Sequence, residues 1–355
     1  MEDSKKIRVA INGFGRIGRV FFRLACDNPE IEIVAINDLA DKNNLNYLLK
    51  YDTPYQRCSS DCTERVKGVQ FLNEPDPHHL PWKDLGIEVV VEATGVFNTY
   101  EKANSHIEAG AGRVVLTAPV KNEKDPSLET PDYGISGKTV LMGINEDELK
   151  TCQISANGSC TTNAVSPVLQ ILNQQIGVEK AILNTIHSYT STQKLVDSPN
   201  KKDYRKGRAG AQNIIPTSTG AAIATTLVIS ELVGKFDGMA MRVPTVLGSI
   251  VDLTFVSKKD TTKEEVNLTL KKASQKENWK NVFSVTEEPV VSSDIIGNPY
   301  ASIADLSLTK VIGGNLVKVL IWYDNEMGYA RTLVKHVLKT NEKSPEVRPP
   351  EMGQN

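Results

Sequence analysis

Cysteine is scarce in this chain, and its scarcity excludes one class of protein. Only five cysteines are spread over 355 residues. An odd number at such low density does not make the disulfide scaffold of a small secreted domain. The chain is instead long enough for two domains, each able to bury its own core.

An excess of charge is also missing. The 41 lysines and arginines nearly balance the 43 aspartates and glutamates, which gives a formal net charge of -2. Without a basic excess to release counterions, we expect neither nucleic acid nor an anionic membrane as a partner. The N-terminus has no apolar segment of signal-peptide length, and no apolar run approaches the ~20 residues that span a bilayer. We therefore expect a soluble, cytoplasmic protein.

Groups of metal ligands are sparse as well. Cys58 and Cys62 have a spacing that could begin a zinc site, and His78 and His79 follow them. No second pair stands at finger-like spacing. We therefore expect no metal, and interpret the two cysteines as solvated or semi-buried thiols.

Short apolar runs alternate with a helical pattern in the first half of the chain. The runs lie at 7–11, 31–38, 87–95, 112–119 and 139–145. Apolar residues recur at helical spacing between 18 and 28. Runs interleaved with helices indicate a parallel sheet that is covered on both faces.

The pattern changes after about Cys160. A helix is expected over 162–175, and the strand candidates that follow are longer and often alternate, which predicts a mixed or antiparallel sheet with one covered face. These candidates lie at 180–190, 239–246, 249–257, 303–309 and 316–325. A polar loop without an element of its own is expected over 191–212, and such loops are usually functional. A last helix is expected over 330–340.

The segment NGFGRIG, residues 12–18, carries the pattern G-x-G-x-x-G between a predicted strand and a predicted helix. A second strand ends at Asp38, twenty residues beyond Gly18. Such glycines let a pyrophosphate approach a helix N-terminus, and Asp38 would accept a hydrogen bond from a ribose 2′-hydroxyl, which favours NAD over NADP. The alternative is a glycine turn followed by an exposed aspartate.

These patterns, together with the motifs around Cys160 and His187 and the family resemblance described below, predict an α/β protein with two domains. The first is a Rossmann-type NAD-binding domain, a doubly wound parallel sheet over 1–159 that is completed by the C-terminal helix over 325–340. The second is an α+β catalytic domain with a mixed sheet over 160–324. A flexible tail is expected over 341–355.

The segment NGSCTTNAVSP, residues 157–167, places Cys160 among small polar residues just before a helix. Amides at a helix N-terminus favour a thiolate and could hold an oxyanion. A nearby imidazolium would lower the pKa of the thiol further, and His187, at a strand end beside the polar loop, is the best candidate. We therefore expect a resting thiolate; the alternative is an inert cysteine and a hydrogen-bonded interior histidine.

Further motifs make the sequence recognisable. With NGFGRIG, they are SCTTN (159–163), HSYTSTQKLVD (187–197), RVPT (242–245) and WYDNEMGY (322–329). In this order they resemble the phosphorylating glyceraldehyde-3-phosphate dehydrogenases, and the resemblance runs from about residue 6 to 339.

The resemblance implies a covalent mechanism. Cys160 would attack the aldehyde, His187 would take the proton, and hydride would pass to the nicotinamide of NAD. Inorganic phosphate would then attack the thioester. The substrate phosphate would be held by Thr190 and Arg242. The attacking phosphate would be held by Ser159, Thr161, Arg205, Thr219 and Gly220.

Two of these assignments have simpler alternatives. The segment TSTG, residues 217–220, could be a helix N-cap and nothing more. Arg205 could be a solvated side chain, with Lys206 or Arg208 binding the phosphate in its place.

The resemblance also implies the cofactor contacts. Asn325 would bind the nicotinamide carboxamide and Tyr329 would pack nearby; the alternative for Asn325 is a cap on the following helix. The remaining contacts would come from Gly13, Phe14, Gly15, Arg16, Ile17, Gly18, Asp38, Thr94, Gly95 and Thr117. Asp38 and Pro199 match the family's NAD pattern.

The chain departs from the family in five places, none of which touches Cys160 or His187. Ala164, Met327 and Pro75 stand where the family usually has cysteine, tryptophan and a basic residue. The segment YDTPYQRCSSDC, residues 51–62, lacks the usual His-Gly, and residues 121–137 are acidic and rich in proline.

Other functions remain open. An erythrose 4-phosphate dehydrogenase would use the same machinery with water as the attacking group, and a non-catalytic binding protein could share the fold. The family is tetrameric, which implies a homotetramer with the polar loop near subunit contacts.

Overall fold

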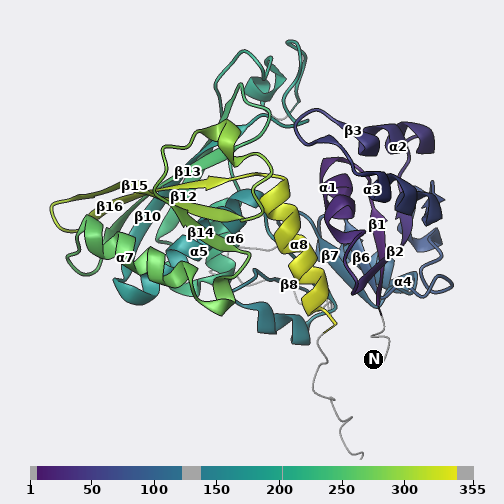
Figure 1. The fold of residues 1–355 in the computed structure, drawn as a ribbon, viewed down its shortest axis with the longest axis horizontal. Coiled ribbons are helices and arrows are strands. Elements are labelled where there is room, and N and C mark those ends of the chain that lie inside the picture. The colour runs from purple at the N-terminus through teal and green to yellow at the C-terminus, as the bar shows by residue number, and fades with distance from the viewer. Residues whose placement is uncertain (1–5, 122–136, 202, 342–355) are drawn as a thin grey trace, which may run out of the picture.

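The computed structural model describes residues 6–121, 137–201 and 203–341. Two seven-stranded sheets lie side by side, and the last helix, α8 (Met327–Lys339), lies between them (Figure 1). The predicted flexible tail beyond residue 341 and most of the acidic segment lie outside the described residues. Within the described ranges, no helix is both long and apolar enough to cross a bilayer.

The first sheet has the strand order β5-β2-β1-β6-β7-β9-β8, and every neighbouring pair in it is parallel. The predicted parallel sheet is confirmed. Its strands are β1 (Ile7–Asn12), β2 (Ile31–Asn37), β5 (Gln70–Leu72), β6 (Val89–Glu92), β7 (Arg113–Leu116), β8 (Gly137–Thr139) and β9 (Ile154–Ala156). The associated helices are α1 (Arg16–Ala25), α2 (Lys42–Lys50), α3 (Ser60–Arg65), α4 (Tyr100–Glu108), η1 (Val66–Gly68), η2 (Pro77–His79) and η3 (Glu146–Thr151).

Strand β1 shows why both faces of the first sheet are covered by helices. Val9 and Ile11 are buried with α1 and with Leu333 of α8, whereas Ala10 faces a separate core that includes Ala103 of α4. Alternate side chains of a strand point to opposite faces, so an apolar run without polar alternation needs helices on both sides.

The run predicted as a strand over 139–145 forms only its beginning. Strand β8 ends at Thr139, and Val140 and Met142 are buried in the core of the second sheet instead. An apolar run fits either core, and local sequence does not choose between them.

The second sheet has the order β11-β12-β10-β13-β16-β15-β14 and is mixed, as predicted. Its strands are β10 (Val178–Ser188), β11 (Ile215–Ser218), β12 (Phe236–Val243), β13 (Ser249–Ser257), β14 (Phe283–Thr286), β15 (Ser302–Ile312) and β16 (Leu316–Tyr323). Helix α5 (Cys160–Gln175) packs on the central strands, between α6 (Ala221–Val228) and α7 (Lys263–Ser274). The short helices are η4 (Tyr204–Gly207), η5 (Ser230–Leu232), η6 (Glu277–Trp279) and η7 (Ser292–Ile295). The sequence predicted that the polar loop over 191–212 has no element of its own. This prediction is wrong, because η4 lies within the loop.

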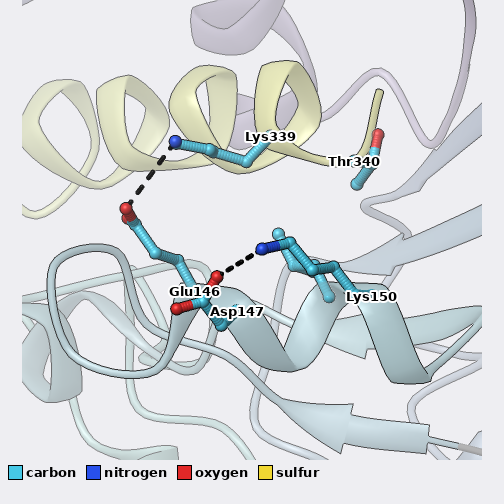
Figure 2. A pocket seen from close by; sticks show the side chains of 6 residues that line it. Glu146, Asp147, Lys150, Lys339 and Thr340 are labelled. Carbon is cyan, nitrogen blue, oxygen red and sulfur yellow. Dashed lines mark hydrogen bonds and ion pairs between the residues drawn. The ribbon is translucent and has the colours of Figure 1, made fainter. Parts of the chain in front are cut away.

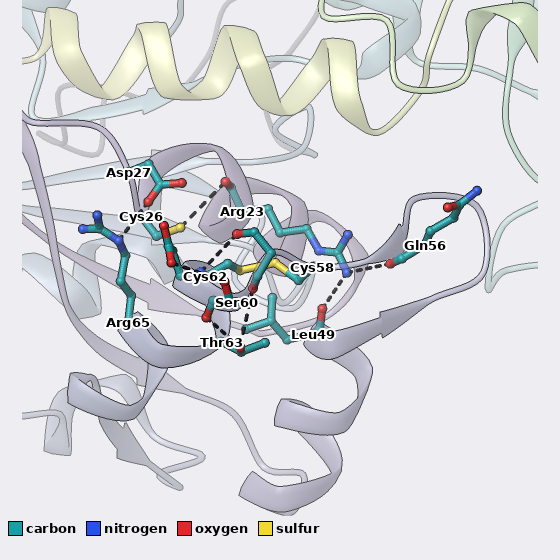
Figure 3. The surroundings of a disulfide bond; sticks show 12 residues. Arg23, Cys26, Asp27, Leu49, Gln56, Cys58, Ser60, Cys62, Thr63 and Arg65 are labelled. Carbon is teal, nitrogen blue, oxygen red and sulfur yellow. Dashed lines mark hydrogen bonds and ion pairs between the residues drawn. A yellow bond between two sulfur atoms is a disulfide. The ribbon is translucent and has the colours of Figure 1, made fainter.

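The interpretation of Cys58 and Cys62 as thiols is wrong, because the two form a disulfide (Figure 3). Ser59 caps α3, and the turn it starts brings the two Cα atoms to 6.2 Å, which a disulfide can bridge. The bond links α3 to the residue that directly follows a small hairpin, β3 (Tyr51–Asp52) and β4 (Gln56–Arg57). Among the described residues, no group of three or more His, Cys, Asp or Glu side chains is placed to hold a metal.

A cavity of about 30 Å³ lies between η3 and the end of α8 (Figure 2). Glu146 pairs with Lys339 across it at 3.8 Å, and Asp147 pairs with Lys150 at 2.6 Å. This volume suits about one water molecule, so we do not interpret the cavity as a ligand site.

Candidate active site

Cys160 and His187 come from different elements and meet at one point. Cys160 is the first residue of α5, which begins two residues earlier than predicted, and His187 stands near the end of β10. The distance from Cys160 Sγ to His187 Nε2 is 3.4 Å, a hydrogen bond for sulfur. The two side chains can therefore exchange a proton directly.

The register of the second sheet adds a positive charge to this pair. Strands β10 and β12 run parallel with His187 directly opposite Arg242. Arg242 Nη1 lies 2.7 Å from His187 Nδ1 and 3.1 Å from the Ser188 carbonyl oxygen. That oxygen also lies 2.7 Å from His187 Nδ1. If Nδ1 carries a hydrogen it can donate to Ser188 but cannot accept from Arg242, so the two contacts compete.

Burial sets the protonation states of the pair. It raises the pKa of the Cys160 thiol, against the opposing effects of Arg242 and the Thr161 amide. It lowers the pKa of His187 to about 3, and the charge of Arg242 acts in the same direction. Burial therefore acts against the predicted resting thiolate, because it favours the uncharged form of both groups.

Tyr323 is a part of this site that the sequence did not reveal. Its hydroxyl lies 3.0 Å from Thr161 Oγ1 and 2.7 Å from Thr185 Oγ1. Its ring meets the His187 imidazole edge-on, with centroids 5.9 Å apart. Tyr323 thus packs against the imidazole of His187. It also forms a hydrogen bond with the hydroxyl of Thr161, one of the predicted phosphate ligands. Its place within WYDNEMGY is the only signal that could have drawn attention to it.

The other predicted phosphate ligands lie on neighbouring elements. Ser159 caps α5, and its Oγ accepts a hydrogen bond from the Thr162 amide. Thr190 follows β10, with its Oγ1 2.9 Å from that of Thr192. Gly220 is the N-cap of α6 and makes no side-chain cap, while Thr219 Oγ1 accepts from the Ala221 amide. TSTG therefore does help to begin a helix.

The two arginines predicted to bind phosphate differ in setting. Arg205 is 64% exposed and pairs with Asp203, and its neighbour Arg208 pairs with Asp197. Arg242, in contrast, has a buried Nε for which no described residue accepts a hydrogen bond. A buried guanidinium nitrogen with an unused hydrogen is suited to an anionic ligand.

The glycine loop before α1 is shaped for close approach of a ligand. Gly13 has φ +93°, and a Cβ there would lie 2.6 Å from the Thr94 amide nitrogen. A Cβ on Gly18 would lie 2.2 Å from the Gly13 carbonyl oxygen, whereas one on Gly15 would meet nothing within 4 Å. Helix α1 begins at Arg16, followed by Ile17, with no side-chain cap from Gly15. Its first amides are thus available to an anion, as a pyrophosphate requires.

The carboxyl ends of three parallel strands meet at this loop. After β2, Asp38 accepts the Phe14 amide at 2.7 Å. After β6, Thr94 and Gly95 are exposed. After β7, the Thr117 hydroxyl donates to the Glu92 carbonyl at 3.0 Å. Ligands of such sheets bind at these strand ends.

Glu92 is a second residue that the sequence did not reveal. It is buried at the end of β6, and its carboxylate accepts the Thr94 amide at 2.8 Å. The same carboxylate bonds Asn12 and His106. Glu92 therefore fixes the loop on which Thr94 stands.

Asn325 lies in the connection between β16 and α8. Its Oδ1 accepts a hydrogen bond from Ser249 Oγ at 3.0 Å. Helix α8 begins at Met327 without a side-chain cap, and Asp324 instead accepts the Met327 amide. The alternative reading of Asn325 as a helix cap is therefore wrong. Tyr329 is buried, with its hydroxyl donating to the Gly158 carbonyl at 3.1 Å.

Comparisons with known proteins agree with this geometry. Residues 7–100 match the family model described as the NAD-binding domain of glyceraldehyde 3-phosphate dehydrogenase, and residues 159–325 match its C-terminal domain.

Similar curated proteins carry the same name. The chain is 48% identical to glyceraldehyde-3-phosphate dehydrogenase of Thermotoga maritima, over 92% of this chain and 97% of that protein. It is 44% identical to the Geobacillus stearothermophilus protein of that name and to glyceraldehyde-3-phosphate dehydrogenase 1 of Bacillus subtilis, over 92% of this chain and 96% of each. The chain therefore belongs to the glyceraldehyde-3-phosphate dehydrogenase family, and NAD is the cofactor of its first domain.

Proposed function

We propose that this chain oxidises glyceraldehyde 3-phosphate to an acyl phosphate, with NAD as the hydride acceptor and inorganic phosphate as the second substrate. The observation that carries the proposal is the 3.4 Å approach of Cys160 Sγ to His187 Nε2 in a chain of this family. An aldehyde that enters the site meets a nucleophile and a base that already share a hydrogen bond.

The first step is attack of Cys160 Sγ on the aldehyde carbon as the thiol proton passes to His187 Nε2. Only a neutral imidazole can accept that proton, and the low pKa of His187, about 3, keeps it neutral. Donation from Nδ1–H to the Ser188 carbonyl leaves the Nε2 lone pair facing the sulfur. The oxyanion forms at the N-terminus of α5, whose amides favour negative charge.

The proton moves twice more before the acyl group leaves. It passes from Nε2 to the oxyanion, and Nε2 takes it back as hydride departs from the same carbon. NAD, when bound, supplies the acceptor for that hydride. The resulting thioester is attacked by inorganic phosphate, and Cys160 leaves as a thiolate that recovers the proton from His187.

Arg242 has a switching role in this proposal. Its contact with His187 Nδ1 competes with the bond from Nδ1 to Ser188. A substrate phosphate held by Arg242 and Thr190 would draw the guanidinium away from the imidazole. Loss of that neighbouring positive charge would raise the pKa of His187, so the base would strengthen when substrate is bound.

We assign the other predicted residues as follows. The phosphate that attacks the thioester is held by Ser159, Thr161, Arg205, Thr219 and Gly220. NAD is bound by Gly13, Phe14, Gly15, Arg16, Ile17, Gly18, Asp38, Thr94, Gly95, Thr117, Asn325 and Tyr329. The free amides of α1 and the convergence of β1, β2, β6 and β7 support the second assignment.

We also propose that residues 1–159 with 325–340 form the NAD-binding domain and 160–324 the catalytic domain, and that the enzyme is a cytoplasmic homotetramer. Ile182 of β10 and Met239 of β12 are 54% and 47% exposed on the second sheet. Exposed apolar side chains on neighbouring strands favour self-association. A Met239→Lys variant that sediments like wild type would argue against this surface.

The decisive experiment is NADH formation by the purified protein with glyceraldehyde 3-phosphate, with and without inorganic phosphate. We expect continuous turnover only with phosphate. Turnover without phosphate, and faster with erythrose 4-phosphate, would indicate hydrolytic deacylation. No NADH under either condition would favour a binding protein on this fold.

A further inference from the structure

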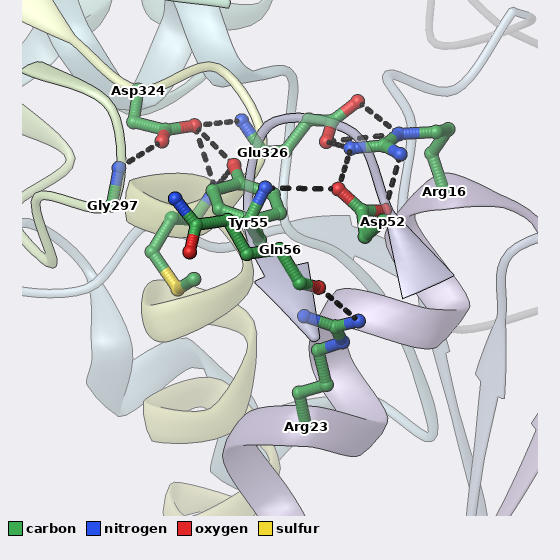
Figure 4. Close-up of polar contacts among 9 residues, drawn as sticks. Arg16, Arg23, Asp52, Tyr55, Gln56, Gly297, Asp324 and Glu326 are labelled. Carbon is green, nitrogen blue, oxygen red and sulfur yellow. Dashed lines mark hydrogen bonds and ion pairs between the residues drawn. The ribbon is translucent and has the colours of Figure 1, made fainter. Parts of the chain in front are cut away.

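The residues on both sides of Asn325 are fastened to the N-terminal part of the chain (Figure 4). Asp324 Oδ1 accepts the Tyr55 hydroxyl at 2.7 Å. Glu326 accepts Arg16 Nε at 2.8 Å. A segment held immediately before and after one residue leaves that residue little freedom to shift.

Arg16 forms the firmer of these two attachments. Its guanidinium bonds Glu326 through Nε and Nη2 and bonds Asp52 through Nη1 and Nη2. The Asp52 and Glu326 side chains are only 6% and 13% exposed. Burial raises the pKa of Glu326, and Arg16 opposes that rise. Forked charge-assisted bonds between poorly solvated groups are both strong and directional.

Tyr55 connects the second attachment to the first. Asp52 Oδ1 accepts the Tyr55 amide at 3.1 Å, so one turn of the β3–β4 hairpin carries both residues. The Tyr55 hydroxyl also accepts the Met327 amide at 3.1 Å. On the opposite side, Asp324 Oδ2 accepts the Gly297 amide at 2.7 Å. The hairpin therefore supports both anchors: Tyr55 holds the fully buried carboxylate of Asp324, and Asp52 holds Arg16, which bonds Glu326.

We propose that the side chains of Arg16 and Tyr55 are positioning residues for the nicotinamide end of the cofactor site, acting through Asn325. The proposal rests on the proposed function, and specifically on Asn325 as the residue of that NAD site which binds the nicotinamide carboxamide. Arg16 is also the first residue of α1, so its backbone stands at the pyrophosphate end while its side chain holds the nicotinamide end. One residue thereby sets the separation between the two ends of the site.

The test compares Arg16→Met and Tyr55→Phe with Arg23→Met as a matched control. Arg23 lies on the same helix and donates to the carbonyls of Leu49 and Gln56, but makes none of the bonds to Asp324 or Glu326 described above. Three quantities are measured: the rate of single-turnover NADH formation without phosphate, the affinity for adenosine diphosphate ribose, which lacks nicotinamide, and the rate of Cys160 alkylation by iodoacetamide.

We expect NADH formation to slow about tenfold in Arg16→Met and several-fold in Tyr55→Phe, because small misplacements of reacting groups are costly. Deuterium at C1 of the aldehyde should slow these variants more than wild type. Affinity for adenosine diphosphate ribose and the alkylation rate should stay within twofold of wild type. Arg16→Lys should recover part of the rate, and Arg23→Met should retain it.

Two outcomes would overturn the positioning role of Arg16 and Tyr55 but leave the proposed function standing. An equal loss of affinity for adenosine diphosphate ribose in Arg16→Met would make Arg16 a pyrophosphate ligand or a determinant of the fold. NADH formation at the wild-type rate in both variants would show that Asn325 needs no such support. Wild-type protein that forms no NADH would instead overturn the proposed function, and the positioning role with it.

Discussion

Helices α1 and α5 both begin at a proposed ligand site, but their first turns are built differently. The N-cap of α5 is Ser159, whose Oγ accepts the Thr162 amide at 3.0 Å. The N-cap of α1 is Gly15, which makes no side-chain cap. In α5 the cap takes up the Thr162 amide and the helix start holds a fixed nucleophile, whereas in α1 no side chain takes up the first amides. The cap therefore fixes the start of α5, while the start of α1 leaves more of its amides to an anion.

The largest effect should come from the nucleophile itself. In Cys160→Ser, we expect NADH formation to fall at least about 10³-fold, because a hydroxyl is a far weaker nucleophile than a thiol beside the same imidazole. Affinity for NAD should not change, since α1 is untouched. A steady-state rate within tenfold of wild type would exclude the covalent route.

Glycine substitutions separate ligand binding from folding at α1. Gly15→Ala should weaken NAD binding about tenfold while leaving the melting temperature unchanged, because its Cβ meets nothing within 4 Å of the protein. Gly13→Ala should lower both, since φ +93° and the 2.6 Å approach to Thr94 strain any side chain, at a cost of about 1–3 kcal/mol. Calorimetric titration and thermal unfolding measure the two quantities. Unchanged NAD affinity in Gly15→Ala would place the pyrophosphate elsewhere.

His336 on α8 extends the comparison from helix starts to a buried side chain near the end of a helix. Burial lowers its pKa to about 3, below the value near 6.5 of an unfolded histidine. The unfolded chain then binds more protons between these values, so stability is lost as pH falls from about 6.5 towards 3, by up to about 1.4 kcal/mol per pH unit for this group. Urea unfolding at pH 6.5 and pH 5 should show a smaller loss for His336→Gln than for wild type. An equal loss in both would assign the pH dependence to other groups.

The smallest effect should come from the Ser159 side-chain cap, which α5 has and α1 lacks. Ser159→Ala should lower the free energy of unfolding by about 1 kcal/mol, the usual cost of losing a serine cap. The control is Ser60→Ala, which lies at the first position of α3 rather than at a cap. Denaturant unfolding measures both, and an equal response would mean that the cap on α5 carries no special weight.

The parts of the molecule that the sequence could predict are those with local causes. Gly18 packs on the Gly13 carbonyl within one turn, and SCTTN places Cys160 at a helix start. The approach of His187 to Arg242 arises instead from the register of two strands far apart in the chain. Tyr323 and Glu92 reach their sites in the same non-local way. The burial that raises the pKa of Cys160 cannot be read from neighbouring residues. The disulfide of Cys58 was mispredicted because spacing alone does not distinguish a free thiol from a disulfide.

The position of α8 has a consequence for biosynthesis. Leu333, Val334 and Val337 complete the core on one face of the first sheet, although the rest of that core comes from the first 120 residues. While the ribosome is still synthesising the second sheet, this apolar face is covered by α1 but lacks the part of its cover that α8 supplies. The nascent N-terminal half is therefore aggregation-prone until translation is nearly finished, and a message truncated before codon 327 would yield a polypeptide that quality control should remove.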